Sequence, residues 1–351
     1  MRTPKLRRAV GAMAALGVII VAFLIFQSVP TSPTPLFRPL PTPNGYDDFL
    51  KAGQLLAGPQ NELSNTNAET LRPLVEQNRT ALGLVRAGLG RECQVPLEFS
   101  TNFLASHMNV LGDFKHLARL LVAEGVLAEA DRNLGDAART YLDLIRFGRA
   151  IAQGGLAIDT LVAEAIQALG VKNFCQISGR LNPAEISGVI EALEEIDRRS
   201  ETFEQILLRE QAYFRKTYGW WYATAPRVLT RIASLRTGVD QTRQTEQTVE
   251  RTFLRRKARL RLLIVHLALQ SYKAELACYP NKLSELIPKY LRALPKDPFG
   301  GEDLVYSPDS VAYRLYSLGP DLKDDGGKPA STRTSAPRKA GEIPQGDIIL
   351  D

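Results

Sequence analysis

Apolar residues recur at helical spacing through most of the chain, from about Tyr46 to Gly238. Side chains three, four and seven positions apart lie on one face of an α-helix, so this spacing predicts a series of amphipathic helices. Two such faces flank a break at 133–136: Leu117, Leu120, Leu121, Leu127 and Ala128 before it, and Ala138, Tyr141, Leu142 and Ile145 after it. Gly135 suits the end of one helix and Asp136 the N-cap of the next, so we expect an antiparallel helix pair.

A third helix has a well-defined predicted start. Asn182 is expected to be its N-cap, Pro183 its first helical residue, and Glu185 the partner that completes a capping box. The apolar spacing that follows extends this helix to about Tyr213. A further long helix is expected from Thr245 to Ala277.

Prolines change the pattern beyond Cys278. They stand at positions 280, 288, 295 and 298 and divide the chain into short pieces, because proline lacks the backbone N–H that regular structure needs. Leu304–Tyr306 and Val311–Leu318 then alternate as the strands of a small antiparallel sheet do. The sequence therefore predicts an α+β fold that is mostly α-helical, with a helical domain over 46–244 and a long helix plus small sheet over 245–351.

The N-terminus is typical of a membrane anchor. Four basic residues lie within positions 1–8, and residues 9–26 carry no charge, which reaches the lower length limit for a bilayer span. Because the basic residues precede the span, we expect a cytoplasmic tail at 1–8, a transmembrane signal anchor at 9–26 and a translocated remainder. A proline-rich linker at 27–45 joins the two. A cleaved signal peptide is the alternative, although 27–30 offers no clear small-x-small cleavage site.

Short acidic side chains alternate with glycines in the last part of the chain. The acidic residues are Asp321, Asp324, Asp325 and Asp347, and the glycines beside them are Gly326, Gly327 and Gly346. Carboxylates and backbone carbonyls supply the oxygen ligands that Ca²⁺ prefers, and glycine lets the chain turn tightly around an ion. The sequence therefore predicts a calcium site here. The alternative is an ordinary acidic surface turn.

Several short pieces occur in a fixed order after residue 262. They are Leu267–Lys273, Tyr279-Pro280, Leu283 with Leu286, Leu294–Gly300, Tyr306, Leu315–Asp321, Asp324–Gly327 and Gly346–Ile348. Because these pieces occur in this order and spacing, the segment of about 262–348 resembles the C-terminal part of the major pseudopilin family of type II secretion systems. The resemblance implies that calcium fastens the C-terminal loop to the sheet. Its implied ligands are Asp321, Asp347, either Asp324 or Asp325, and backbone carbonyls near Leu318.

The rest of the chain departs from that family. Residues 1–26 contain neither a prepilin cleavage site nor the glutamate that follows it, and a long helical segment precedes the pseudopilin-like part. We therefore expect an anchored protein that carries a pseudopilin-like module. Together with the N-terminal charge pattern, this predicts a single-pass protein of the bacterial inner membrane whose bulk is extracytoplasmic. The resemblance implies envelope or secretion-system proteins as partners.

The charge distribution argues against a nucleic-acid partner, and the cysteine spacing argues against a metal site. Much of the net charge of +6 lies in the N-terminal tail and in the basic segment 251–261. That segment is expected to be the solvated face of a helix, so we predict no nucleic-acid partner. Cys93, Cys175 and Cys278 are dispersed without metal-ligand spacing, which leaves either one disulfide or three free thiols open.

No catalytic motif appears in the sequence. His107, His116 and His266 are expected on separate helical segments and match no metalloprotease or zinc-finger spacing; His266 is expected to be a hydrogen-bonded core residue. We therefore predict a non-catalytic structural or interaction protein. Two alternatives remain open. A helical binding module would have an apolar groove, and an envelope hydrolase would have a pocket where two acids or a histidine converge.

Overall fold

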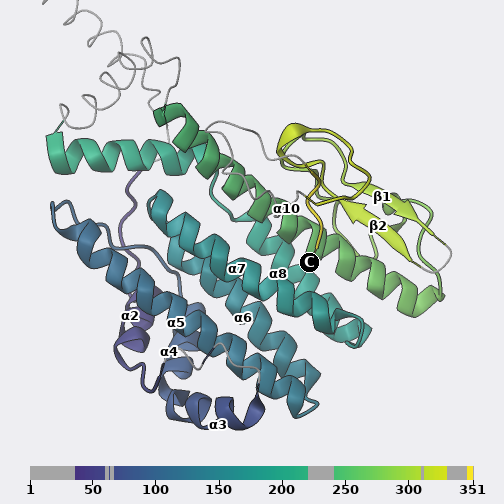
Figure 1. Ribbon diagram of the computed structural model, residues 1–351, viewed down its shortest axis with the longest axis horizontal. Coiled ribbons are helices and arrows are strands. Elements are labelled where there is room, and N and C mark those ends of the chain that lie inside the picture. The colour runs from purple at the N-terminus through teal and green to yellow at the C-terminus, as the bar shows by residue number, and fades with distance from the viewer. Residues whose placement is uncertain are drawn as a thin grey trace, which may run out of the picture. The chain divides into compact units, whose positions relative to one another are not determined.

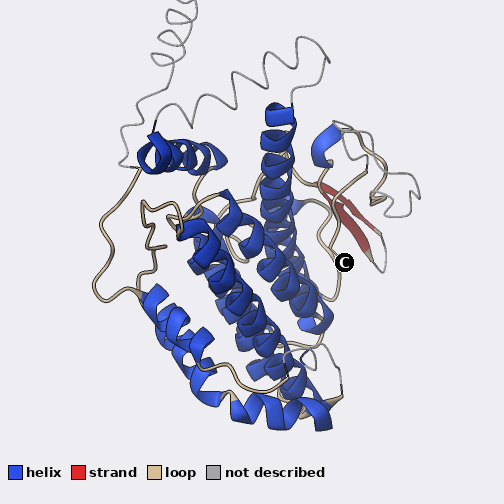
Figure 2. Cartoon of the chain, turned by 60° about the vertical axis from the view of Figure 1, so that its left-hand side comes forward, coloured by secondary structure: helices blue, strands red, loops and turns tan. Residues whose placement is uncertain are grey.

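Helices form most of the described chain and a two-stranded antiparallel sheet completes it, as the sequence predicts (Figures 1 and 2). The computed structural model describes residues 36–59, 63, 67–219, 241–309, 312–329 and 346–350. It divides the chain into two units, Met1–Arg38 and Pro39–Asp351, and all that follows concerns the second. The predicted anchor at 9–26 lies outside the described residues. Within the described part, no helix combines the length and the apolar character that crossing a membrane requires.

The helices follow one another in the order of the labels in Figure 1. They are α2 (Gly45–Gln54), α3 (Ala68–Gln77), α4 (Arg79–Leu89), α5 (Phe103–Ala130), α6 (Leu134–Ala152), α7 (Ala157–Ser178), α8 (Pro183–Arg198), a helical segment at 203–219, and α10 (Gln241–Leu276). The last of these begins four residues earlier than predicted. All three cysteines are free thiols.

The predicted antiparallel pair α5–α6 is present, but the expected cap positions are wrong. Asn133, not Asp136, is the N-cap of α6, and its side-chain oxygen accepts a hydrogen bond from the N–H of Asp136. Arg132, not Gly135, takes the left-handed conformation that reverses the chain, with φ of 59°. Asparagine is as good an N-cap as aspartate, so the spacing alone allowed both positions.

Helix α8 begins as predicted and ends earlier. Asn182 and Glu185 form the reciprocal capping box, with Pro183 in the first turn. The helix stops at Arg198 instead of continuing to Tyr213. Thr202 and Gln205 then form a second pair of reciprocal side-chain bonds that starts the segment 203–219. This Thr-x-x-Gln signal is the reason for the break, and it outweighs the continuous apolar spacing.

Two hydrophobic cores share the pair α6–α7. The first core packs α2, α3, α4 and α5 against one side of the pair, with Phe49 and Phe147 in edge-to-face contact at 5.0 Å between ring centroids. The second core packs α8, α10 and the C-terminal sheet against the other side, around Tyr141, Phe174 and Leu263. Because this second core includes residues from before and after 245, the helical part and the C-terminal module pack directly on each other. The predicted boundary at 244–245 stays a prediction.

Glycines permit the close approach of the three central helices. A side chain at Gly170 of α7 would meet the backbone of Tyr141 in α6, and one at Gly148 of α6 would meet the backbone of Ala163 in α7. On the other side of α6, the ring of Tyr141 occupies the space where Gly125 of α5 lacks a side chain. Tyr141 is fully buried, and its hydroxyl donates to Glu129 of α5 at 2.6 Å.

The C-terminal module packs beside α10 (Figures 1 and 2). After the short 3₁₀ helix η2 (Leu283–Leu286), strands β1 (Val305–Pro308) and β2 (Tyr313–Tyr316) pair antiparallel with Val305 opposite Tyr316. The predicted strands are therefore confirmed in outline, although β1 runs two residues further and β2 is shorter. A second 3₁₀ turn, η3 (Gly319–Asp321), follows β2.

We expect Gly125→Ala to destabilise the protein by about 1–3 kcal/mol, because the added methyl group overlaps the immobile ring of Tyr141. Gly112 lies in the same helix with open space around it, so Gly112→Ala is the matched control. It should instead stabilise the protein by about 0.4–1 kcal/mol. Denaturant unfolding of both variants of the full chain in detergent measures this. Equal effects would contradict the close contact of α5 and α6.

Candidate functional site

The segment 346–350 returns to the end of β2 and closes the C-terminal module. Ser317 and Ile348 exchange two backbone hydrogen bonds, at 3.0 and 2.9 Å. The N–H of Asp347 donates to the carbonyl of Lys328 at 2.9 Å, and the side chain of Ile348 is buried in the second core. This segment therefore joins three parts of the module: the sheet, the loop after η3, and the core beneath them.

Asp347 is the most unusual of the predicted ligands, because its side chain is only 3% exposed. One carboxylate oxygen, Oδ2, accepts a hydrogen bond from the N–H of Gly327 at 2.7 Å. The other, Oδ1, is buried and has no hydrogen-bond partner among the described residues. Burial is the largest cause that raises the pKa of the Asp347 carboxyl, and the charges of Asp324 and Asp325 raise it further, whereas the backbone N–H groups of Gly327 and Asp325 lower it. A buried carboxylate oxygen without a donor is costly unless something else satisfies it.

The other predicted ligands are placed unequally. Asp321 ends η3 and is half-buried, and its Oδ2 also lacks a partner within the described chain. Asp324 is exposed and already engaged, since its Oδ1 accepts from the Tyr316 hydroxyl and from the N–H of Gly326, both at 2.8 Å. The Tyr316 bond is the largest cause that lowers the pKa of Asp324. Asp325 is exposed. At Leu318, whose backbone was also a predicted ligand, the N–H donates to Asp297.

These side chains fit a calcium ion only with help from the backbone. Ca²⁺ takes six to eight oxygen ligands. Over the described ranges, no three His, Cys, Asp or Glu side chains lie close enough together to hold a metal. The candidate side-chain ligands that remain are the two aspartates with an unpartnered oxygen, Asp321 and Asp347, and carbonyl groups would have to supply the other ligands. Residues 330–345, which separate these aspartates in the sequence, lie outside the described chain.

Asp297 is the residue of this module that the site prediction missed. It is 2% exposed, and its two oxygens accept three hydrogen bonds: from the Ser317 hydroxyl, the N–H of Leu318 and the N–H of Phe299, at 2.9 to 3.0 Å. It thus fixes the residue that pairs with Ile348. Its sequence signal is the stretch Lys296–Gly301, where an aspartate beside a proline and two glycines indicates a turn closed by its own side chain.

The three histidines lie on two helices, not on three separate helical segments as predicted. His107 and His116 lie on the same helix, α5, so the expectation of three separate segments is wrong. His107 lies 2.6 Å from Asp159 through Nε2, both side chains are at most 5% exposed, and Phe103 stacks on the imidazole. The second oxygen of Asp159 accepts from the N–H of Leu156 at the start of α7. This pair joins α5 to α7 within the core.

His266 joins the C-terminal sheet to the helices, as expected of a hydrogen-bonded core residue. From α10, its Nε2 lies 2.8 Å from the Ser178 hydroxyl of α7, and its Nδ1 lies 2.5 Å from the Tyr313 hydroxyl of β2. Burial lowers the pKa of His266 to about 4, so the ring is neutral at pH 7.

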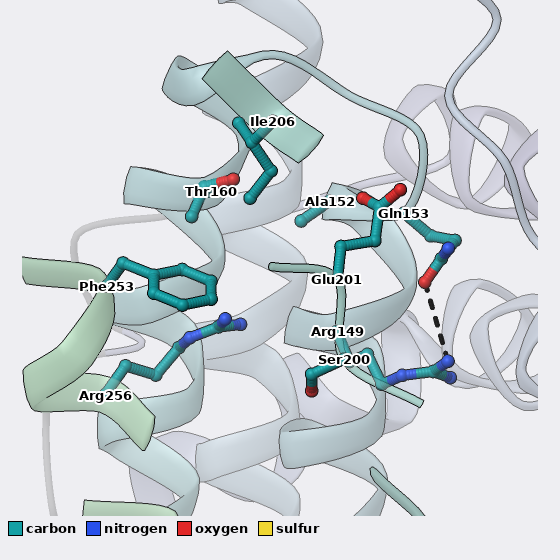
Figure 3. Close-up of a pocket in the computed structure, with 9 residues that line it drawn as sticks. All are labelled: Arg149, Ala152, Gln153, Thr160, Ser200, Glu201, Ile206, Phe253 and Arg256. Carbon is teal, nitrogen blue, oxygen red and sulfur yellow. Dashed lines mark hydrogen bonds between the residues drawn. The ribbon is translucent and has the colours of Figure 1, made fainter. Parts of the chain in front are cut away.

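A small hollow lies between α6, α7, α10 and the segment 199–206 (Figure 3). It encloses about 20 Å³ and is lined by Arg149, Ala152, Gln153, Thr160, Ser200, Glu201, Ile206, Phe253 and Arg256.

The basic residues of α10 between Arg251 and Arg261 are only partly exposed, so the expectation that they form the solvated face of the helix is wrong. Arg261, for example, pairs with Asp197 of α8 at 2.9 Å.

Comparison of the chain with protein-family models, with curated proteins and with solved structures finds no match. The functional argument therefore rests on the residues of the chain itself.

We expect Asp297→Ala to destabilise the protein by about 2–5 kcal/mol, because it leaves the buried donors of Ser317 and Leu318 without an acceptor. Asp303→Ala is the control. Asp303 is an exposed aspartate of the same module whose ion pair with Lys296 contributes about 0–1 kcal/mol. Denaturant unfolding of the full chain measures both variants. A cost for Asp297→Ala as small as that of the control would contradict its role as an organising residue.

His266 should make the protein sensitive to mild acid. Because its pKa is lowered on folding, the unfolded chain binds the proton more readily, and stability falls as the pH drops from the ordinary value of about 6.5 towards 4. The loss reaches up to about 3 kcal/mol. We expect His266→Gln, which cannot titrate, to remove this part of the pH dependence, and His116→Gln to retain it. Unfolding free energies over this pH range test this, and parallel curves for wild type and His266→Gln would refute it.

Proposed function

We propose that this chain is a non-catalytic, membrane-anchored protein of the bacterial cell envelope with a pseudopilin-like C-terminal module. In this proposal, residues 9–26 span the inner membrane once, and the helical part and the module are extracytoplasmic. A calcium ion fastens the C-terminal loop of the module, and the protein serves a structural or interaction role with envelope or secretion-system proteins.

One observation carries the proposal: the buried carboxylate of Asp347 has an oxygen without a partner among the described residues. This oxygen lies at the point where segment 346–350 pairs with the sheet. Asp321, the other aspartate that the pseudopilin resemblance implies as a ligand, has an unpartnered oxygen too. A cation would satisfy both oxygens and would offset the burial of the charge.

Calcium would act here as a cross-link. Asp321 belongs to the turn after β2, and Asp347 belongs to the segment that pairs with Ser317. An ion held by both would tie these two parts of the chain together when the module folds. Since the ion binds the folded state alone, it would stabilise the protein by mass action, by about 2.7 kcal/mol at one hundred times the dissociation constant.

Calcium should therefore raise the midpoint of thermal unfolding of the full chain in detergent. At saturation we expect a rise of about 2–4 °C over the value in chelator, whereas Mg²⁺ should give less because it favours a tighter octahedral shell. Asp347→Asn and Asp321→Asn should each remove most of the rise, and Asp303→Asn should keep it. The proposed site is refuted if calcium has no effect, or if both variants respond as the wild type does.

Without calcium, Asp347→Asn should be neutral or stabilising. The raised pKa of Asp347 means that its charge opposes folding when nothing compensates it. The chelated wild type should accordingly lose this penalty as the pH falls through the raised pKa, and the asparagine variant should not. Unfolding midpoints of both proteins in chelator measure the difference. A strongly destabilised asparagine variant would indicate that the carboxylate is already satisfied.

A further inference from the structure

Two arginines from distant parts of the sequence line the same hollow. Arg149 comes from α6 and Arg256 from α10. Figure 3 shows the side chain of Arg256 reaching into the hollow, while the guanidinium of Arg149 is turned towards Gln153. The hydroxyl-bearing residues Thr160 and Ser200 also line this space. The hollow therefore gathers cationic and hydroxyl groups from three elements and a loop.

Three neighbouring arginines, Arg209, Arg199 and Arg261, have carboxylate partners. Arg209 forms a two-pronged pair with Glu201, at 2.7 and 2.8 Å, and also donates to the carbonyl of Gly155. Arg199 pairs with Glu195, and Arg261 with Asp197. The carboxylates of Glu195, Asp197 and Glu201 are therefore already paired.

Arg149 and Arg256 lack such partners. Arg149 donates only at the limit of hydrogen-bond distance, at 3.5 Å to Gln153 and 3.4 Å to the carbonyl of Arg199, and its buried Nε has no partner in the part of the chain that the structure describes. Arg256 lies over the ring of Phe253, with 4.9 Å between the guanidinium carbon and the ring centroid. Neither guanidinium forms an ion pair with a carboxylate of the described residues. Glu201 lines the same hollow, but its carboxylate is paired with Arg209, so neither positive charge has a carboxylate of its own.

The surroundings make this arrangement costly. Burial is the largest cause that lowers the pKa of Arg149 and that of Arg256. A second positive charge lowers each pKa further, Arg199 for the former and Arg149 for the latter, and the nearby carboxylates, Glu201 among them, offset this only in part. Glu164 of α7 attracts Arg256 but compensates its charge only in part, because burial raises the pKa of Glu164 to about 7. Partly buried cations without a counter-charge destabilise a fold unless an anion joins them.

We propose that this hollow binds a tetrahedral oxyanion, a phosphate or sulfate group, between the guanidinium groups of Arg149 and Arg256. Two unpaired guanidiniums match the charge of a dianion and offer it forked N–H donors. The enclosed space of about 20 Å³ holds little more than a water molecule, so the anion lies at the open mouth. The long, weak hydrogen bonds of Arg149 allow its guanidinium to turn from Gln153 to the ligand.

The test is calorimetric titration of the full chain in detergent with inorganic phosphate, with chelator present so that the calcium site stays empty. Ionic strength is held constant with chloride. Phosphate should bind, and the unfolding midpoint should rise by about 2–4 °C at saturation relative to chloride. Arg149→Gln and Arg256→Gln should each weaken phosphate binding by about tenfold or more. Arg146→Gln, an exposed arginine of the same helix, is the matched control and should bind as the wild type does.

A folding defect is distinguishable from loss of the site. Because Arg256→Gln removes an uncompensated charge, it should unfold at the same or a higher temperature than the wild type when phosphate is absent, and only its response to phosphate should be lost. The proposal is overturned if chloride and phosphate act alike, which would indicate screening alone. It is also overturned if both glutamine variants bind phosphate normally, which would place the anion elsewhere.

Discussion

The described fold depends on one packing constraint: α6 and α7 must each be buried on two sides. Each contributes to the core formed with α2–α5 and to the core formed with α8, α10 and the sheet. Because a helix buried on two sides has no wide polar face, these helices need apolar residues around most of their circumference. They also need small residues where their backbones approach, which Gly148 and Gly170 provide. Every other element packs, directly or through α5 and α10, on this pair.

The C-terminal module adds a second level of organisation that depends on polar groups. Its sheet has two short strands, which is too little to be stable alone. It therefore relies on α10 beneath it, on the carboxylate of Asp297 at the end of β2, and on the returning segment 346–350. In our proposals, two places where charged side chains lack partners within the described chain, the Asp347 carboxylate and the arginine hollow, bind ions of opposite sign from outside the chain.

Local signals in the sequence predicted the start of α8 but misplaced the caps between α5 and α6, where Asn133 competes with Asp136. The capping box at Asn182 and Glu185 depends only on neighbouring residues, and it was predicted residue by residue. The end of α8 was missed because a second capping signal at Thr202 competes with unbroken apolar spacing. The acidic loop was visible as composition, and the fold adds which aspartate oxygens lack partners. Arg149 and Arg256 could not be paired from the sequence, since only the packing of α6 against α7 and α10 brings such distant residues to one hollow.

The hydrogen bonds of His266 run in one direction only. The Ser178 hydroxyl donates to the carbonyl of Cys175, which can only accept, so Ser178 must accept from Nε2–H of the imidazole. The free Nδ1 then accepts from the Tyr313 hydroxyl. Each proton in this series is thereby assigned, and the ring is held as a single tautomer. Adding a proton at Nδ1 would set two donors against each other at the junction between sheet and helices, so β2 would lose its side-chain hydrogen bond to α10 in one step.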